Sequence, residues 1–158
     1  MDRIVAGVDG SEASARALQW AVDEARVHGY AVEAVYVYEH TPSWQMYAYG
    51  EVGPVVGEEW TRESRDETAR VARSLVEDVV SRVRNPERVP IEPVVVEDRR
   101  PARALVDRSR TAAMLVVGSR GRGGFAGLVL GSVGQQCAHH AECPLVILRH
   151  DVDESEDA

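Results

Sequence analysis

The sequence predicts an α/β fold with an open five-stranded parallel sheet and helices on both faces. Strand patterns alternate with helix patterns along most of the 158 residues, as is typical of parallel sheets whose crossover helices cover both faces. The predicted strands are short, continuous apolar runs, which fits strands buried on both faces. Pro93 lies within one of them and lacks the N–H group that a sheet ladder needs. That strand is therefore expected at an edge of the sheet or with a bulge.

The individual elements follow from residue periodicity and helix punctuation. The first strand, residues 4–8, ends before Asp9, and Ser11 is placed to cap a helix that Gly29 ends. Pro101 suits the first turn of a later helix. The remaining strands are expected over residues 32–38, 91–96, 114–117 and 145–148, and the remaining helices over residues 58–84, 101–110 and 132–140.

Composition indicates one domain over residues 1–150, followed by an acidic tail over residues 151–158 that we expect to be disordered. Hydrophobic residues make up 44% of the chain and charged residues 28%, the balance of a soluble globular protein. The net charge is −8, and without a basic stripe no nucleic-acid partner is expected. The chain shows no secretory signal or membrane-spanning run, so we expect a cytoplasmic protein with no membrane association.

The glycine-rich segment from Gly118 to Ser132 carries the strongest functional signal and is predicted to form a phosphate cradle. Gly118 and Gly121 would let backbone N–H groups turn toward an anion, and Gly131 would open a helix whose N-terminus faces the same anion. Ser132 could either cap that helix or donate its hydroxyl to a phosphate oxygen. A flexible surface loop is the alternative, but a position between a buried strand and a helix favours a ligand site.

Other patterns limit or extend this hypothesis. All 18 basic residues are arginine, so the lysine-containing P-loop motif is excluded. The connection over residues 40–57 is interpreted as a surface excursion, with a lid or partner surface as the alternative; it carries Trp44, Met46, Tyr47 and Tyr49. Zinc binding by the segment from Cys137 to Cys143 is not expected, because its Cys and His side chains would not point toward a common position if the segment is helical. Cys137 is instead predicted to be a small core residue.

The spacing Gly118-x2-Gly121-x9-Gly131-Ser132 resembles the nucleotide-binding signature of the universal stress protein family. The opening strand with Asp9 and the last two strands resemble the same family, so that the likeness covers nearly the whole chain. It implies strand order 3-2-1-4-5 in an adenine nucleotide alpha hydrolase-like fold, with nucleotide between the ends of strands 1 and 4. The order reverses there, which is the topological switch point of an open sheet.

The resemblance also implies a role for each site residue. Asp9 would accept hydrogen bonds from the ribose hydroxyls, although an Asx turn or a helix cap competes for the same carboxylate, whose two oxygens allow both roles. Gly7 would lie close to the nucleotide, and Val37 would meet adenine through its backbone N–H and C=O groups. Base and sugar would contact Val117 and Gly118, and the phosphates would be surrounded by Arg120, Gly121, Gly131, Ser132 and Val133.

The function implied by the resemblance is an ATP-binding regulatory protein of the stress response. ADP and AMP are alternative ligands, Mg²⁺ is a candidate companion ion, and the expected partners are a second copy paired through the last strand and an unidentified regulatory protein. Gly134 departs from the family, whose ATP-binding members often carry Ser or Thr there. A lost neutral hydrogen bond would cost about 0.5–1.5 kcal/mol.

Two alternatives therefore stay open. One is an interaction or scaffold protein of the same fold without useful ATP affinity, and the other is a slow ATP hydrolase. No catalytic residue or metal ligand is predicted, because Asp9 is the only acid that clearly reaches the site. At most, weak hydrolysis or self-phosphorylation is expected.

Overall fold

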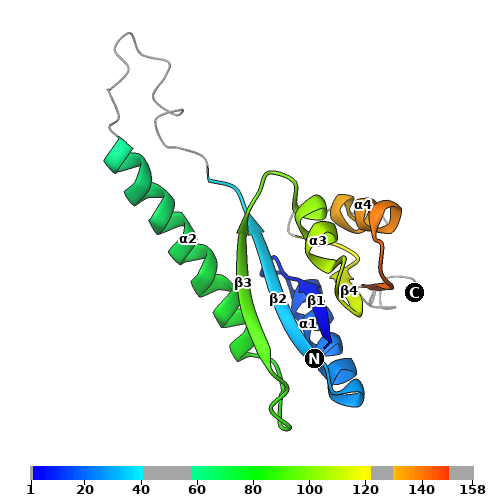
Figure 1. Ribbon diagram of the computed structural model, residues 1–158. Helices are drawn as coiled ribbons and strands as arrows, with labels where there is room; N and C mark the ends of the chain where they lie inside the picture. Colours follow the sequence, from blue (N-terminus) through cyan, green and yellow to red (C-terminus); the bar gives the residue numbers. More distant parts are fainter. Residues whose placement is uncertain (1, 41–57, 122–129, 150–158) are drawn as a thin grey trace, which may run out of the picture.

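The computed structural model describes residues 2–40, 58–121 and 130–149, and its strands form one parallel sheet in the order β3-β2-β1-β4-β5 (Figure 1). The predicted fold class and strand order are thereby confirmed. The elements in chain order are β1 (Arg3–Gly7), α1 (Glu12–His28), β2 (Ala31–Tyr38), α2 (Glu58–Ser81), β3 (Ile91–Glu97), α3 (Pro101–Ser109), β4 (Met114–Gly118), α4 (Ser132–His140) and β5 (Leu145–Leu148).

The helices lie in two layers, one on each face of the sheet (Figure 1). The core against α1 and α2 contains Ile4 and Ala6 of β1, whereas Val5 of the same strand belongs to the core against α3 and α4. Successive side chains of a strand point to opposite faces. Because both faces of β1 are buried, its sequence reads as a continuous apolar run.

Local sequence signals set the two ends of α1. Ser11 is the N-cap, and its hydroxyl accepts a hydrogen bond from the Ser14 N–H at 3.2 Å. Gly29 ends the helix in the left-handed conformation with φ of 69°, which a side chain would strain. Both predicted boundaries are confirmed.

Strand β3 is an edge strand, as Pro93 requires. It pairs only with β2 among the described strands, in an unbroken parallel register from Val32 opposite Ile91 to Tyr38 opposite Glu97. Pro93 lies opposite Ala34 within this register. The edge position is therefore confirmed, and the alternative of a bulge is not needed.

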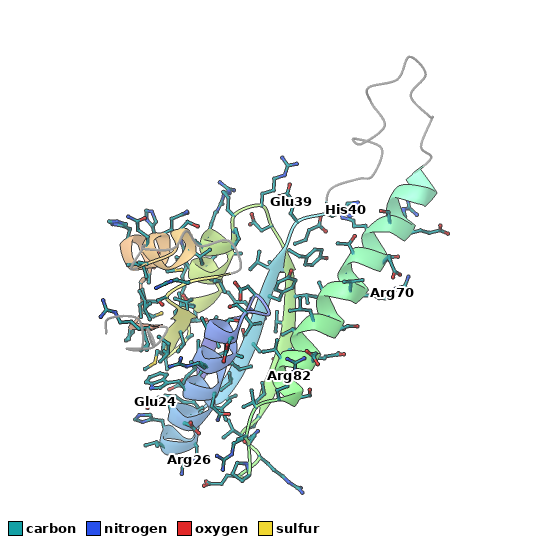
Figure 2. The ribbon with its side chains drawn as sticks, turned by 180° about the vertical axis from the view of Figure 1, so that it is seen from behind. Glu24, Arg26, Glu39, His40, Arg70 and Arg82 are labelled. Carbon is teal, nitrogen blue, oxygen red and sulfur yellow. The ribbon has the colours of Figure 1, made fainter. Side chains whose placement is uncertain are left out.

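Helix α2 ends at Ser81, three residues before the predicted end at Arg84. The Arg84 N–H donates to Gln19 Oε1 at 2.8 Å, and Gln19 Nε2 donates to the Arg84 carbonyl at 3.0 Å. A side chain of α1 therefore takes both backbone groups of Arg84 out of the helical pattern. Figure 2 shows Arg70 on the outer side of α2 and Arg82 near the end of this helix.

Three sequence predictions fall on residues outside the described part of the chain. They concern the aromatic connection over residues 41–57, the glycine-rich residues 122–129 and the acidic tail 151–158. Among the helices that the structure describes, none is both long enough and apolar enough to cross a membrane.

Candidate functional site

A cavity of about 450 Å³ opens where β1 and β4 end, at the point where the strand order reverses. This is the switch point at which open α/β sheets bind ligands, and the volume suits a small molecule. The structure gathers all ten predicted site residues around this cavity: Gly7, Asp9, Val37, Val117, Gly118, Arg120, Gly121, Gly131, Ser132 and Val133. Their contacts with a nucleotide stay a prediction.

The two carboxylate oxygens of Asp9 have different surroundings. Oδ1 accepts a hydrogen bond from the Ser11 N–H at 2.9 Å, which is the Asx turn that the sequence offered as a competing role. Oδ2 lies against the glycine-rich loop, because a side-chain carbon built at Gly121 would be 2.5 Å from it. One oxygen thus shapes the turn before α1, and the other lies toward the loop that bounds the cavity.

Gly131, rather than Ser132, is the N-cap of α4. Gly131 has extended φ and ψ of −74° and 165°, and no side chain caps the helix. The suggestion that Ser132 caps α4 is therefore wrong: Ser132 is the first helical residue, and it lines the cavity. The Gly131 N–H instead donates to the Ser119 carbonyl at 2.6 Å, which joins the start of α4 to the end of β4.

Arg120 is the only basic residue among the described residues that line the cavity. Its Nε is buried and has no hydrogen-bond partner within the described part of the chain. A buried donor without an acceptor costs free energy, so an acceptor supplied by a ligand would stabilise this side chain. The N-terminus of α4 adds backbone N–H groups and a favourable dipole. Chemically, this end of the cavity suits an anion.

Another part of the cavity wall is apolar. It is formed by Val35, Val37, Pro101, Leu105 and Val117. A side-chain carbon at Gly7 would lie 2.9 Å from Leu105 Cδ1 and 3.3 Å from Val117 Cγ1, so a larger residue would have to displace these side chains from the cavity wall. An apolar wall of this kind suits a flat, weakly polar group such as a nucleobase.

Sequence reasoning missed several residues of the cavity wall. Pro101 and Leu105 come from α3, which is distant in sequence from the first strand. Pro101 at the first helical position was a usable signal, because it places the start of α3 at the carboxyl edge of the sheet. Ser14 and Ser119 also line the cavity, although they are not among the ten predicted site residues.

Gly134 lies in the first turn of α4 and is buried. A side-chain carbon there would be 2.9 Å from Leu130 Cδ1. The Leu130 side chain thus approaches the space that a serine or threonine at this position would use. In this chain, the replacement of the family's Ser or Thr by Gly134 is therefore accompanied by the close packing of Leu130.

Cys137 is a core residue, as predicted. It is fully buried in the core beneath α3 and α4, and burial raises the pKa of its thiol to about 11. No group of three or more His, Cys, Asp or Glu side chains is arranged to hold a metal ion in the part of the chain that the structure describes.

The sequence model of the Universal stress protein family matches residues 1–149. The chain therefore belongs to the universal stress protein family. Universal stress protein Rv2623 of Mycobacterium tuberculosis is 35% identical over 155 residues, which cover 94% of this chain and 46% of that protein. The chain thus spans about half the length of the curated relatives it matches.

Solved structures support the same assignment of the fold. The universal stress protein UspA from Lactobacillus plantarum superposes with a TM-score of 0.63 at 20% identity, covering 94% of this chain and 97% of that one. A universal stress protein crystallised in complex with cAMP has a TM-score of 0.58 and 26% identity, with 95% and 98% covered.

Proposed function

We propose that this chain is an ATP-binding regulatory protein of the stress response. The observation that carries the proposal is the cavity at the switch point, which is lined by all ten residues of the predicted site, including Arg120 with its unpartnered Nε. The related universal stress protein that was crystallised with cAMP supports an adenine nucleotide as the ligand class.

The polarity of the cavity suggests one orientation for the nucleotide. Adenine would lie at the apolar end near Val37, with the ribose hydroxyls toward Asp9 Oδ2. The phosphates would lie at the N-terminus of α4, within reach of Arg120 and the Ser132 hydroxyl. ADP and AMP would use the same base and ribose contacts.

Mg²⁺ would be held chiefly by the phosphates and water in this arrangement. Asp9 is the only carboxylate among the described lining residues, and it is assigned to the ribose. A slow ATP hydrolase would need a group to position water near the phosphates. Turnover well above that of a double variant, Ser132→Ala with Asp9→Ala, would favour this second candidate function.

We further propose that two copies pair through β5 in the cytoplasm and that the nucleotide state alters contact with a regulatory protein. Strand β5 is an edge of the sheet, and its four apolar residues are only partly buried. Such an edge favours pairing with a second strand. Replacing Ile147 by a charged residue should then yield monomers in sedimentation experiments. A wild-type protein that itself sediments as a monomer would contradict the pairing.

The scaffold alternative is favoured by Gly134 and the adjacent Leu130 side chain, since one phosphate-directed hydroxyl is missing. Mass spectrometry of the protein as purified separates the two proposals. Bound ATP carried through purification would refute the scaffold alternative.

Calorimetric titration with ATP tests the nucleotide site itself. Arg120→Gln should weaken binding by about tenfold, because a hydrogen bond to a charged group is lost. Arg110→Gln is the matched control: Arg110 lies outside the cavity and forms surface ion pairs with Asp107 and Glu142. Equal, negligible binding by wild type and both variants would refute the proposal.

A further inference from the structure

Ser14 is a buried polar residue of the cavity wall whose hydroxyl and N–H both form hydrogen bonds within the Asp9 turn. It lies in the first turn of α1 and is only 4% exposed. Its hydroxyl accepts a hydrogen bond from the Asp9 N–H at 3.2 Å and donates one to the Ser11 carbonyl at 2.9 Å. Its own N–H donates to Ser11 Oγ at 3.2 Å.

These bonds act on Asp9 together with the Asx turn. Ser14 holds the main chain of Asp9 through its N–H, and the Ser11 N–H holds the side chain through Oδ1. A residue fixed at both its backbone and one carboxylate oxygen has little freedom left for the second oxygen. Oδ2 is therefore kept on the side of Gly121, at the edge of the cavity.

We propose that Ser14 is the positioning residue of the nucleotide site: it orients the Asp9 carboxylate toward the ribose and thereby sets the preference for ribonucleotides over deoxyribonucleotides. This inference rests on the proposed nucleotide-binding function. Ser14 itself does not contact the ligand in this account; it acts through Asp9.

If Ser14 had only a structural role, the expected result would be different. Loss of the hydroxyl would then affect the fold and weaken every nucleotide equally. If Ser14 positions Asp9, its loss leaves the part-buried Asp9 N–H without its acceptor and allows the turn to relax. The penalty should then fall on nucleotides that carry both ribose hydroxyls.

The experiment compares ATP, 2′-deoxy-ATP and 3′-deoxy-ATP by calorimetric titration of the full chain and of Ser14→Ala. Wild type should bind ATP about tenfold more tightly than at least one deoxy analogue, since a charged hydrogen bond is missing from that complex. In Ser14→Ala the ratio of ATP affinity to deoxy-analogue affinity should fall toward one. The reason should be a loss of ATP affinity and not a gain of affinity for the analogue.

Ser109→Ala is the matched control. Ser109 is also a fully buried helical serine, and its hydroxyl donates to the Val106 carbonyl at 3.0 Å, but it does not line the cavity. It should keep the wild-type ratio. Ser14→Thr retains the hydroxyl and should restore most of the preference, with thermal unfolding used to verify that each variant is folded.

Three outcomes would overturn the inference. The first is a Ser14→Ala variant that keeps the wild-type ratio of ATP affinity to deoxy-analogue affinity. The second is a wild type that binds all three nucleotides equally. The third is a folded Ser14→Thr variant whose affinity ratio stays near one. A wild type that binds ATP with an unchanged Ser14→Ala ratio refutes only the role of Ser14. A wild type that binds none of the three nucleotides refutes the proposed function as well.

Discussion

Replacing Gly121 by alanine should weaken nucleotide binding while leaving the domain folded. The added carbon would lie 2.5 Å from Asp9 Oδ2, whereas close C···O contacts in proteins are about 3.3–3.6 Å. Either the loop or the carboxylate must therefore move by roughly 1 Å. Because Oδ1 is held by the Ser11 N–H, the movement would displace Oδ2 or the loop that we propose contacts the phosphates.

The expected magnitudes differ for folding and for binding. Gly121 is exposed, and its φ is not in the left-handed region. Restricting the unfolded chain would stabilise the variant by about 0.4–1 kcal/mol, which offsets local strain, so the free energy of unfolding should change by less than about 1 kcal/mol. Loss of a charged hydrogen bond to the ribose would cost about 1.5–3 kcal/mol, or about 10- to 150-fold in affinity.

The assay is calorimetric titration with ATP, accompanied by urea unfolding of the same samples. Gly131→Ala provides a comparison within the same loop, because its added carbon would lie an acceptable 3.4 Å from the Ser119 carbonyl oxygen. Gly131→Ala should lose less affinity than Gly121→Ala. A folded Gly121→Ala variant with wild-type affinity would refute the reasoning, because the position of Asp9 Oδ2 would then have no bearing on binding.

Three further predictions follow from the packing around the site. Gly118→Ala should destabilise the domain by about 1–3 kcal/mol in urea unfolding, because its added carbon would lie 3.1 Å from the backbone of Ala13 in α1; unchanged stability would contradict this packing. Gly134→Ser should raise ATP affinity by about two- to tenfold in calorimetry, since only the flexible end of Leu130 must give way; unchanged or weaker binding would count against it. The raised pKa of Cys137 means that its contribution to stability is present below about pH 9 and is lost as pH rises toward 11. In urea unfolding between about pH 9 and 11, the free energy of unfolding of Cys137→Ala should therefore fall less than that of wild type. Equal decreases would contradict the raised pKa of the buried thiol.

The predictable part of the fold rests on local backbone chemistry. Proline has no N–H group, so Pro93 predicted either an edge strand or a bulge, and β3 is an edge strand. Ser11 and Gly29 predicted the ends of α1 because capping and the left-handed conformation favour these residue types. The predicted cavity residues came from glycine spacing together with the family resemblance, and the fold brings them around one cavity.

The parts that could not be predicted depend on contacts between distant residues. Helix α2 ends early because Gln19 binds Arg84 across 65 positions of sequence. Leu105 forms the apolar wall because α3 packs over β1, which no local pattern reveals. The choice between Gly131 and Ser132 as N-cap depends on the extended backbone that the Ser119 carbonyl holds in place.

We propose above all that the cavity at the ends of β1 and β4 holds ATP. The most direct measurement is calorimetric titration with ATP of the wild-type chain and of the double variant Asp9→Ala, Gly131→Glu. We predict saturable binding by wild type with one nucleotide per chain. We predict no measurable binding by the folded variant, which lacks the proposed ribose acceptor and places a negative charge beside the proposed phosphate position. Equal binding by the two proteins, whether tight or negligible, would contradict the proposal.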